Sequence, residues 1–193
     1  MIEAVATLKG TGPVLMHNVR LANPLDEFAK RLKEVNGKRG KTDENYAEIA
    51  EIEFLGGLYW HKDTGPYIPG EWIFASLVEG ARLKKKGKHV QRGVMLGAGG
   101  DRNKLVYKGP RDPDKLEKDA NFRLVKPVRV GASRVMRTRP IFHEWSATVP
   151  IYVDSEIINF EDLREIAKEA GRYVGIGDHR PMYGRYEATL EKV

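Results

Sequence analysis

The sequence contains no cysteine, which excludes disulfides, thiolate-ligated zinc, iron–sulfur clusters and a catalytic thiol. It also lacks an apolar run of the roughly 18 residues needed to span a bilayer. Residues 1–4 lack the basic region and apolar core of a signal peptide. With 41% hydrophobic and 31% charged residues, the composition is that of a folded domain rather than a disordered chain. We therefore expect a soluble cytoplasmic protein that makes no membrane contact.

Motifs for nucleotide hydrolysis and for hydrolytic catalysis are absent as well. The chain has no Walker loop, no Gly-x-Ser-x-Gly and no paired-carboxylate signature. Its five histidines include no pair with the His-x-x-x-His spacing of a metal site: His17, His61, His89, His143 and His179. These absences favour a protein without a cofactor, without a metal and without catalysis.

Charge is the feature that most suggests a partner. Lys and Arg number 33 against 27 Asp and Glu, a formal net charge of +6. Acidic residues gather on segments with helical patterning, whereas basic residues gather at 33–41, 82–92, 102–108, 134–139 and 180–185. This separation predicts one positive face, which would attract a nucleic-acid backbone.

Hydrophobic periodicity predicts an α+β fold. Expected strands cover 2–8, 122–130, 133–139, 141–153 and 185–192, and expected helices cover 23–37, 42–56, 71–84 and 160–174, the first of them capped by Asn23. Omitting two insertions, at about 20–68 and 85–121, leaves the order β-α-β-β-α-β, which is ferredoxin-like and resembles that of RNA-recognition domains. We expect one elaborated domain over residues 1–193.

Two loops at matching points of this order resemble the RAMP superfamily, the ferredoxin-like RNA-binding proteins of CRISPR effector complexes and guide-RNA processing. The first is Pro-Tyr-Ile-Pro-Gly-Glu at 66–71, which opens a helix ending in Gly-Ala-Arg at 80–82. The second is the glycine-containing loop 175–185, before the last strand. The segments 15–18, 54–59, 134–140 and 177–181 are also similar to a group of phage-encoded proteins. The resemblance implies that loop 175–185 lies against a nucleic-acid backbone.

The residues of loop 175–185 suit that role. Gly175, Gly177 and Gly184 would let backbone amides approach a phosphate. Arginine and aromatic side chains would add charge-assisted bonds and base stacking: His179, Arg180, Tyr183 and Arg185. The alternative is structural, with Gly175 ending a helix and a proline turn following it.

Other basic and aromatic residues are candidates for the same interface. They are Arg134, Arg137 and Arg139 on a predicted strand, Lys84, Lys85 and Lys86 in a lysine run, Lys38 and Arg39 between two helices, and Trp60 on a predicted hairpin. Each has a plainer alternative, since charged edge strands resist aggregation, lysine runs are commonly solvated surface, and tryptophans commonly pack in the core.

Together these features predict a non-catalytic protein that binds single-stranded RNA or DNA, with several copies along the strand or within a larger ribonucleoprotein. Two other functions stay open. By analogy with RAMP endoribonucleases, His17 or His179 would act as general acid or base in metal-independent RNA cleavage. The second is a protein–protein scaffold or inhibitor whose basic loops dock on an acidic partner.

Overall fold

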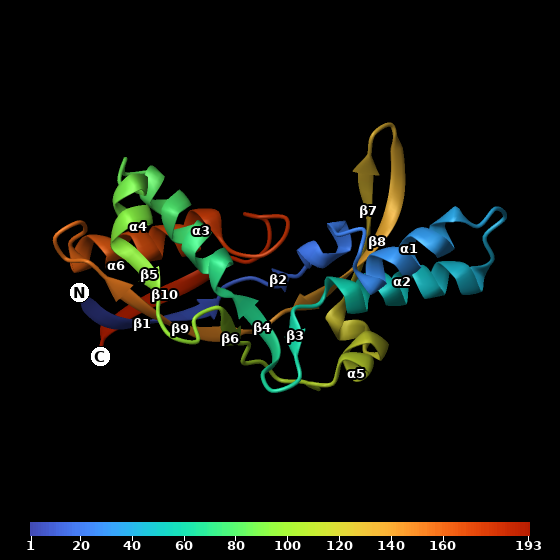
Figure 1. The fold of residues 1–193 in the computed structure, drawn as a ribbon, viewed down its shortest axis with the longest axis horizontal. Coiled ribbons are helices and arrows are strands. Elements are labelled where there is room, and N and C mark those ends of the chain that lie inside the picture. The colour runs from blue at the N-terminus through green and yellow to red at the C-terminus, as the bar shows by residue number, and fades with distance from the viewer. The chain divides into compact units, whose positions relative to one another are not determined.

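Helices and strands are mixed along the chain, with 39% of the residues helical and 30% in strands of antiparallel sheets. The computed structural model describes the backbone of residues 1–193 and every side chain except that of Val130. The chain forms two compact units, coloured along the chain in Figure 1. Unit 1 consists of Met1–Val14, His61–Lys108 and His143–Val193, and unit 2 consists of Leu15–Trp60 and Gly109–Phe142.

A four-stranded sheet forms the centre of unit 1. Its strands in spatial order are β10 (Tyr186–Lys192), β1 (Ile2–Gly10), β9 (Ser146–Val153) and β5 (Val94–Leu96), and each neighbouring pair runs antiparallel. Alternation buries Ala4, Ala6 and Leu8 of β1. Ala6 lies opposite the buried Val149 of β9, so the two central strands contribute to one core.

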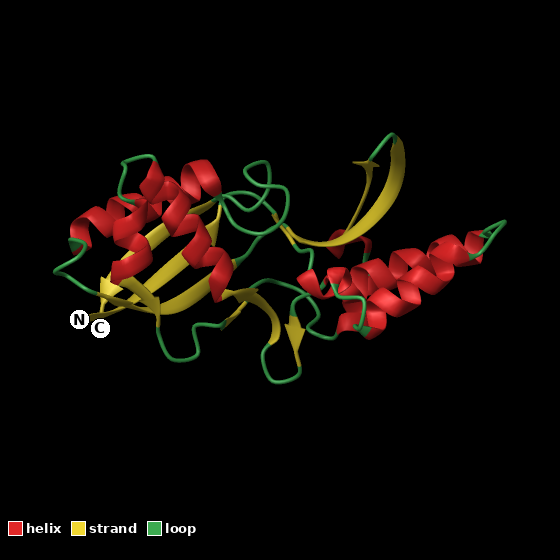
Figure 2. Cartoon of the chain, turned by 45° about the horizontal axis from the view of Figure 1, so that its top comes forward, coloured by secondary structure: helices red, strands yellow, loops and turns green.

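Three helices of unit 1 lie on one face of this sheet, as Figure 2 shows: α3 (Gly70–Arg82), α4 (Gly87–Gly93) and α6 (Phe160–Glu169). Helix α6 continues into a wider, π-type turn, η3 (Ala170–Val174). Leu163, Ile166 and Ala167 recur at helical spacing and are buried. Close packing of α3 on η3 depends on Gly80, where a Cβ would come within 2.7 Å of the Ala170 Cβ.

Short strands precede helix α3. β4 (Gly65–Pro69) pairs antiparallel with β6 (Arg102–Lys104), and the buried Asn103 amide donates to the carbonyl oxygens of Ile68 at 3.1 Å and Gly100 at 2.8 Å. β2 (Val14–Leu15) and β3 (Trp60–His61) are two residues each and lie where the chain passes from one unit to the other.

Unit 2 contains a helical hairpin of α1 (Glu27–Gly37) and α2 (Asp43–Gly57), drawn side by side in Figures 1 and 2. Thr42 caps α2 through a capping box with Asn45, as the sequence predicts for this helix start. The expected start of α1 is wrong, because Asp26 rather than Asn23 caps it by accepting a hydrogen bond from the Phe28 amide.

The strands β7 (Arg123–Val130) and β8 (Ser133–Phe142) form an antiparallel hairpin, here called the β7–β8 hairpin. The short strand β2 pairs with β8 and completes a three-stranded sheet. Two short helical segments precede the hairpin, α5 (Pro113–Lys118) and η2 (Ala120–Phe122), and a third, η1 (Val19–Ala22), precedes α1. At the end far from its turn the hairpin packs against α2, with Pro140, Ile141 and Phe142 buried.

Most helices and strands lie where the sequence predicts them, but the sheets that the strands join differ from the expected ones. Strand 2–8, helices 71–84 and 160–174 and strand 185–192 are confirmed within a few residues. Strands expected at 122–139 to join the main sheet instead form the β7–β8 hairpin of unit 2, and the expected insertion 85–121 supplies β5 to the main sheet. The expected strand 141–153 is divided, with 141–142 in β8 and 146–153 in β9.

Candidate nucleic-acid interface

Like the segment 82–92, which holds six Lys and Arg and no acid, the β7–β8 hairpin is strongly basic. Its strands hold six basic residues and no acidic one: Arg123, Lys126, Arg129, Arg134, Arg137 and Arg139. Two of the six are paired with acids outside the hairpin, Arg123 with Glu117 at 3.3 Å and Arg137 with Glu53. The predicted residues Arg134, Arg137 and Arg139 thus lie together on one element, joined by three basic residues that were not predicted.

The strand register brings like charges directly opposite one another. Lys126 pairs with Arg137, and Arg129 pairs with Arg134 near the turn. Directly opposed like charges destabilise an antiparallel pair. Arg129 and Arg134 are both exposed, and the Arg129 Nε donates to the Gly131 carbonyl oxygen at 3.1 Å. A bound anion would therefore reduce the repulsion between these basic side chains.

A buried carboxylate orients one of these arginines. Glu53 of α2 is 4% exposed and forms an ion pair with the Arg137 guanidinium through Oε1. Its Oε2 accepts a hydrogen bond from the Thr138 backbone N–H at 2.8 Å. Glu53 was not predicted, although an acid between the apolar residues Ile52 and Phe54 was a visible signal for a buried partner.

Arg137 and Glu53 line a hollow of about 400 Å³ in unit 2, here called the arginine pocket. Arg129, Arg139 and His17 line it as well. His17 was predicted from one part of the sequence and Arg137 and Arg139 from another, and the pocket brings the three together. Leu21, Leu32 and Val128 supply an apolar wall.

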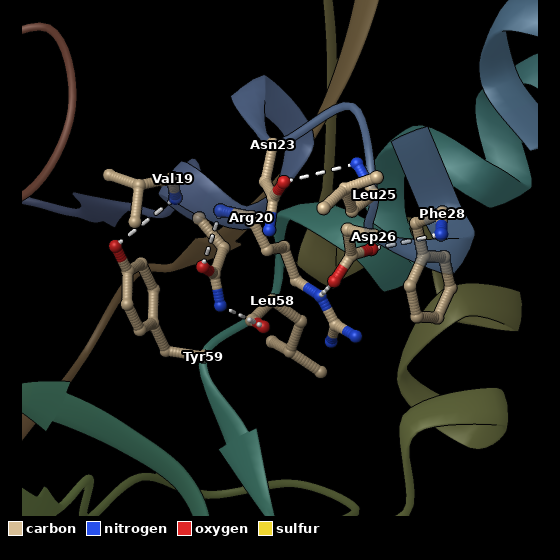
Figure 3. Close-up of polar contacts among 9 residues, drawn as sticks. Val19, Arg20, Asn23, Leu25, Asp26, Phe28, Leu58 and Tyr59 are labelled. Carbon is tan, nitrogen blue, oxygen red and sulfur yellow. Dashed lines mark hydrogen bonds and ion pairs between the residues drawn. The ribbon is translucent and has the colours of Figure 1, made fainter. Parts of the chain in front are cut away.

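Hydrogen bonds fix the segment that places His17 and Leu21 at the pocket (Figure 3). The Asn18 side chain donates to the Leu58 carbonyl oxygen at 3.2 Å and accepts from the Arg20 amide at 3.1 Å. The Tyr59 hydroxyl accepts from the Val19 amide at 3.4 Å. This anchoring positions one side of the pocket without using the residues that line it.

A guanidinium holds the start of α1 in the same region. The Arg20 Nε donates to the Asp26 carboxylate at 3.1 Å, and its guanidinium lies 4.4 Å from the centre of the Phe28 ring. Asn23 accepts from the Leu25 amide at 3.0 Å, so this asparagine forms a turn ahead of the helix, as Figure 3 shows. The chain between η1 and α1 is therefore held by side-chain contacts at both ends.

Loop 175–185 lies in unit 1, and its glycines have a structural role. Gly175, Gly177 and Gly184 have φ between +76° and +79°. A Cβ at Gly184 would lie 1.7 Å from the Ile176 carbonyl oxygen. The Gly184 amide donates to the Pro13 carbonyl oxygen at 2.7 Å and the Gly175 amide to that of Ala170 at 2.8 Å, so two of the amides predicted to face phosphates are engaged within unit 1.

The side chains of this loop are more accessible than its amides. His179, Arg180 and Arg185 are exposed, and Tyr183 is half-buried with its ring centre 6.0 Å from that of His179. The Arg185 Nε donates to the Pro181 carbonyl oxygen at 3.0 Å. The loop is therefore a rigid base that displays a histidine and two arginines.

Two residues of the lysine run are paired with acidic residues of α6. Lys84 forms an ion pair with Glu169 at 3.0 Å and Lys86 with Asp162 at 2.5 Å. Lys85, between them, is exposed and has a positive φ of 58°. These contacts match the alternative interpretation of a solvated surface better than a dedicated phosphate site.

Three further predicted residues, Lys38, Arg39 and Trp60, lie in unit 2 but do not line the arginine pocket. Lys38 follows α1 and forms a 3.7 Å ion pair with Glu48, while Arg39 is exposed in the turn before α2. Trp60 is 38% exposed, and its indole N–H donates to the Arg111 carbonyl oxygen at 2.9 Å. Trp60 is thus tethered at its indole N–H, with about a third of the residue open to solvent.

Two structural findings limit other kinds of site. The described residues include no group of three or more His, Asp or Glu side chains placed to hold a metal ion. Among the same residues, no helix combines the length and the apolar character needed to cross a bilayer.

Comparison of the sequence with known protein families and with curated proteins found no match. The resemblance to the RAMP superfamily therefore stays a prediction, and function has to be argued from the residues themselves.

Proposed function

We propose that the protein binds single-stranded nucleic acid, RNA or DNA, through phosphate contacts made by the β7–β8 hairpin. The observation that supports this most is that the strands of one hairpin hold six basic residues and no acid, with Lys126, Arg129 and Arg134 exposed at the surface. Lys and Arg side chains that neutralise phosphates release counterions and supply most of sequence-independent affinity. A strand of phosphates would also relieve the like-charge pair Arg129–Arg134.

Exposed apolar groups on the same hairpin favour a single strand over a duplex. Val125 is 49% exposed and Met136 is 57% exposed, and Pro127, opposite Met136, is exposed too. By strand alternation all three share a face with Arg129 and Arg134. Bases are accessible for apolar contact when a strand is unpaired, whereas a duplex presents mainly its phosphates. The mixture of apolar and cationic groups therefore suits an unpaired strand.

Unit 1 supports the proposal through its fold and its exposed loop. We propose that β1, α3, β5, β9, α6 and β10 form a ferredoxin-like arrangement of RAMP type, supported by the strand order β10-β1-β9-β5 and by the positions of α3 between β1 and β5 and of α6 between β9 and β10. His179, Arg180 and Arg185 on loop 175–185 would then be a second contact for the strand.

The test is fluorescence anisotropy of labelled single-stranded RNA, single-stranded DNA and duplex at salt concentrations from about 50 to 200 mM, where phosphate contacts lose affinity steeply. We expect single strands to bind more tightly than duplex. Arg129→Ala with Arg134→Ala should weaken binding by about tenfold and lower the salt slope by about 1 to 2, since each phosphate contact contributes roughly one unit.

The matched control is Lys115→Ala with Lys118→Ala, which removes two exposed cations of α5 and changes net charge equally. Equal weakening by both double variants would show only a general charge effect and would contradict a hairpin site. No binding by the unmodified protein at 50 mM salt would overturn the proposal and favour an acidic protein partner instead.

RNA cleavage is the second candidate, because His17 lies on a pocket lined by three arginines. Arginines stabilise the charge that develops on a phosphate under attack, and a histidine can transfer the proton. The test is incubation of end-labelled RNA with the protein in the presence of a chelator. Intact RNA after prolonged incubation eliminates this candidate, whereas cleavage that is lost in His17→Ala would establish it.

A further inference from the structure

The arginine pocket differs from the rest of the hairpin because it is enclosed by several elements. Its lining comes from η1 and the residue His17 before it, from α1, from α2 and from both strands of the hairpin. Its volume of about 400 Å³ is in the range of small-molecule sites. A hollow of this size accommodates one nucleotide-sized group rather than a stretch of strand.

The electrostatics of the pocket favour an anion. Glu53 is its acidic residue, and that carboxylate already contacts the Arg137 guanidinium and the Thr138 amide. Arg129 and Arg139 add two further positive charges to the lining. Because one acid is set against three arginines, the pocket carries a net positive charge even when His17 is neutral.

Arg137 is oriented so that it can serve a ligand as well as Glu53. The contact with Glu53 uses the Nη1 group, one part of a planar fork with five N–H donors. The Arg137 side chain stays 34% exposed. Holding one side of the guanidinium by a buried carboxylate fixes the direction of the remaining donors, which is the arrangement that recognises phosphate oxygens.

We propose that the arginine pocket binds a phosphate monoester, with its oxygens on Arg129, Arg137 and Arg139 and its organic part against Leu21, Leu32 and Val128. A monoester carries close to two negative charges at pH 7, more than an internal phosphodiester, and so gains more from three arginines. The two sources of this chemistry are the terminal phosphate of a strand and a free nucleoside monophosphate. The first source rests on the proposed function, whereas the second does not.

The test compares one oligonucleotide sequence with a 5′-phosphate, a 3′-phosphate or hydroxyl groups at both ends. At about 100 mM salt we expect one phosphorylated form to bind about tenfold more tightly than the hydroxyl form, a difference of about 1.4 kcal/mol. In parallel, adenosine 5′-monophosphate is added without a strand, and we expect at millimolar concentration a rise in Tm of about 2 °C.

The variant Ala22→Glu places a carboxylate at the pocket, and Ala22→Gln is its neutral control of equal size. Ala22 lines the pocket and is exposed, so neither change disturbs the core. We expect the preference for a terminal phosphate and the Tm shift to disappear in Ala22→Glu and to remain in Ala22→Gln. Both variants keep every basic residue of the hairpin, so binding of the hydroxyl oligonucleotide should change less than threefold.

The outcomes separate this inference from the proposed function. Equal binding of all three oligonucleotides, together with no Tm shift, would overturn the pocket inference while leaving strand binding intact. A Tm shift that Ala22→Glu abolishes, in a protein that binds no strand, would support the pocket and overturn the proposed function. A phosphate preference that survives in Ala22→Glu would also overturn the pocket inference, because the phosphate would then be bound elsewhere.

Discussion

Glu53 and Arg137 form an ion pair whose two members differ sharply in exposure, 5% for the Glu53 side chain and 34% for that of Arg137. The charge of the buried carboxylate is stabilised by Arg137 and by the Thr138 amide, whereas water can reach the outer side of the guanidinium. The pair joins α2 to β8 at residues 84 positions apart in the sequence. It therefore links the helical hairpin of unit 2 to the base of the β7–β8 hairpin.

This asymmetry predicts unequal effects of the two single substitutions. Arg137→Met leaves a buried carboxylate without a cation and should lower the free energy of unfolding by about 3 kcal/mol or more. Glu53→Gln leaves an arginine that water can reach and keeps an acceptor for the Thr138 amide, so the loss should be about 1 kcal/mol. Urea unfolding followed by circular dichroism measures both. Equal losses, or a larger loss for Glu53→Gln, would show that the carboxylate is not the dependent partner.

Adding a single methyl group at Gly184 should strongly destabilise the protein. Gly184→Ala places a Cβ 1.7 Å from the Ile176 carbonyl oxygen at a φ of +77°, so both steric overlap and backbone strain arise. We expect a loss of about 3 kcal/mol or more in the free energy of unfolding. The control is Gly99→Ala, where φ is +76° and no atom lies within 4 Å of the added Cβ, so that only strain of about 1 kcal/mol applies. Similar losses in the two variants would contradict the packing argument.

Local signals in the sequence predicted most elements of unit 1. Asn159 accepts from the Glu161 amide at 2.8 Å and caps α6 at the point where the helix 160–174 was expected to begin. The alternation of residues 2–8 and 185–192 predicted strands that are confirmed as β1 and β10. These features depend on side chains within a few positions of one another, and for that reason they can be recognised without knowing the fold.

Features that depend on distant contacts were not predictable in the same way. β5 has three residues, Val94–Leu96, and its place in the main sheet comes from pairing with β9, a strand distant in the sequence. The alternation of residues 123–142 indicated strands but could not indicate which sheet they join. The same limit applies to the site, since neither the pairing of Glu53 with Arg137 nor the position of His17 beside Arg139 follows from sequence spacing.

Exposed arginines and paired lysines of unit 1 should contribute differently to strand binding. Arg180→Gln with Arg185→Gln removes two exposed cations of loop 175–185, and we expect single-strand affinity to fall by about fivefold. Lys84→Gln with Lys86→Gln changes net charge equally but removes cations already paired with Glu169 and Asp162, so affinity should fall less than twofold. Anisotropy at about 150 mM salt, where charges beyond roughly 8 Å are screened, distinguishes the two. A larger effect of the lysine pair would identify the lysine run as the contact.

The Tyr186 hydroxyl predicts a loss of stability at high pH. Burial raises the pKa of Tyr186 to about 12, while its 2.9 Å hydrogen bond to Ser76 and the charge of Arg180 oppose this shift. The unfolded tyrosine ionises near pH 10. Because the folded state keeps the proton that the unfolded state loses, the contribution of Tyr186 is complete below about pH 10 and declines as pH rises toward 12.

Replacing Tyr186 by Phe tests this contribution. At pH 8 we expect a loss of about 1 kcal/mol from the missing hydrogen bond to Ser76. Between pH 8 and pH 11 the free energy of unfolding should fall by about 1 kcal/mol more in the unmodified protein than in Tyr186→Phe. The reason is that the Tyr186 hydroxyl ionises in the unfolded chain but stays protonated in the folded one, and the variant lacks this hydroxyl. Urea unfolding of both proteins at the two pH values gives the difference, and other groups that titrate in this range cancel. A difference between the two proteins that is independent of pH would show that the Tyr186 hydroxyl ionises as readily in the folded as in the unfolded chain.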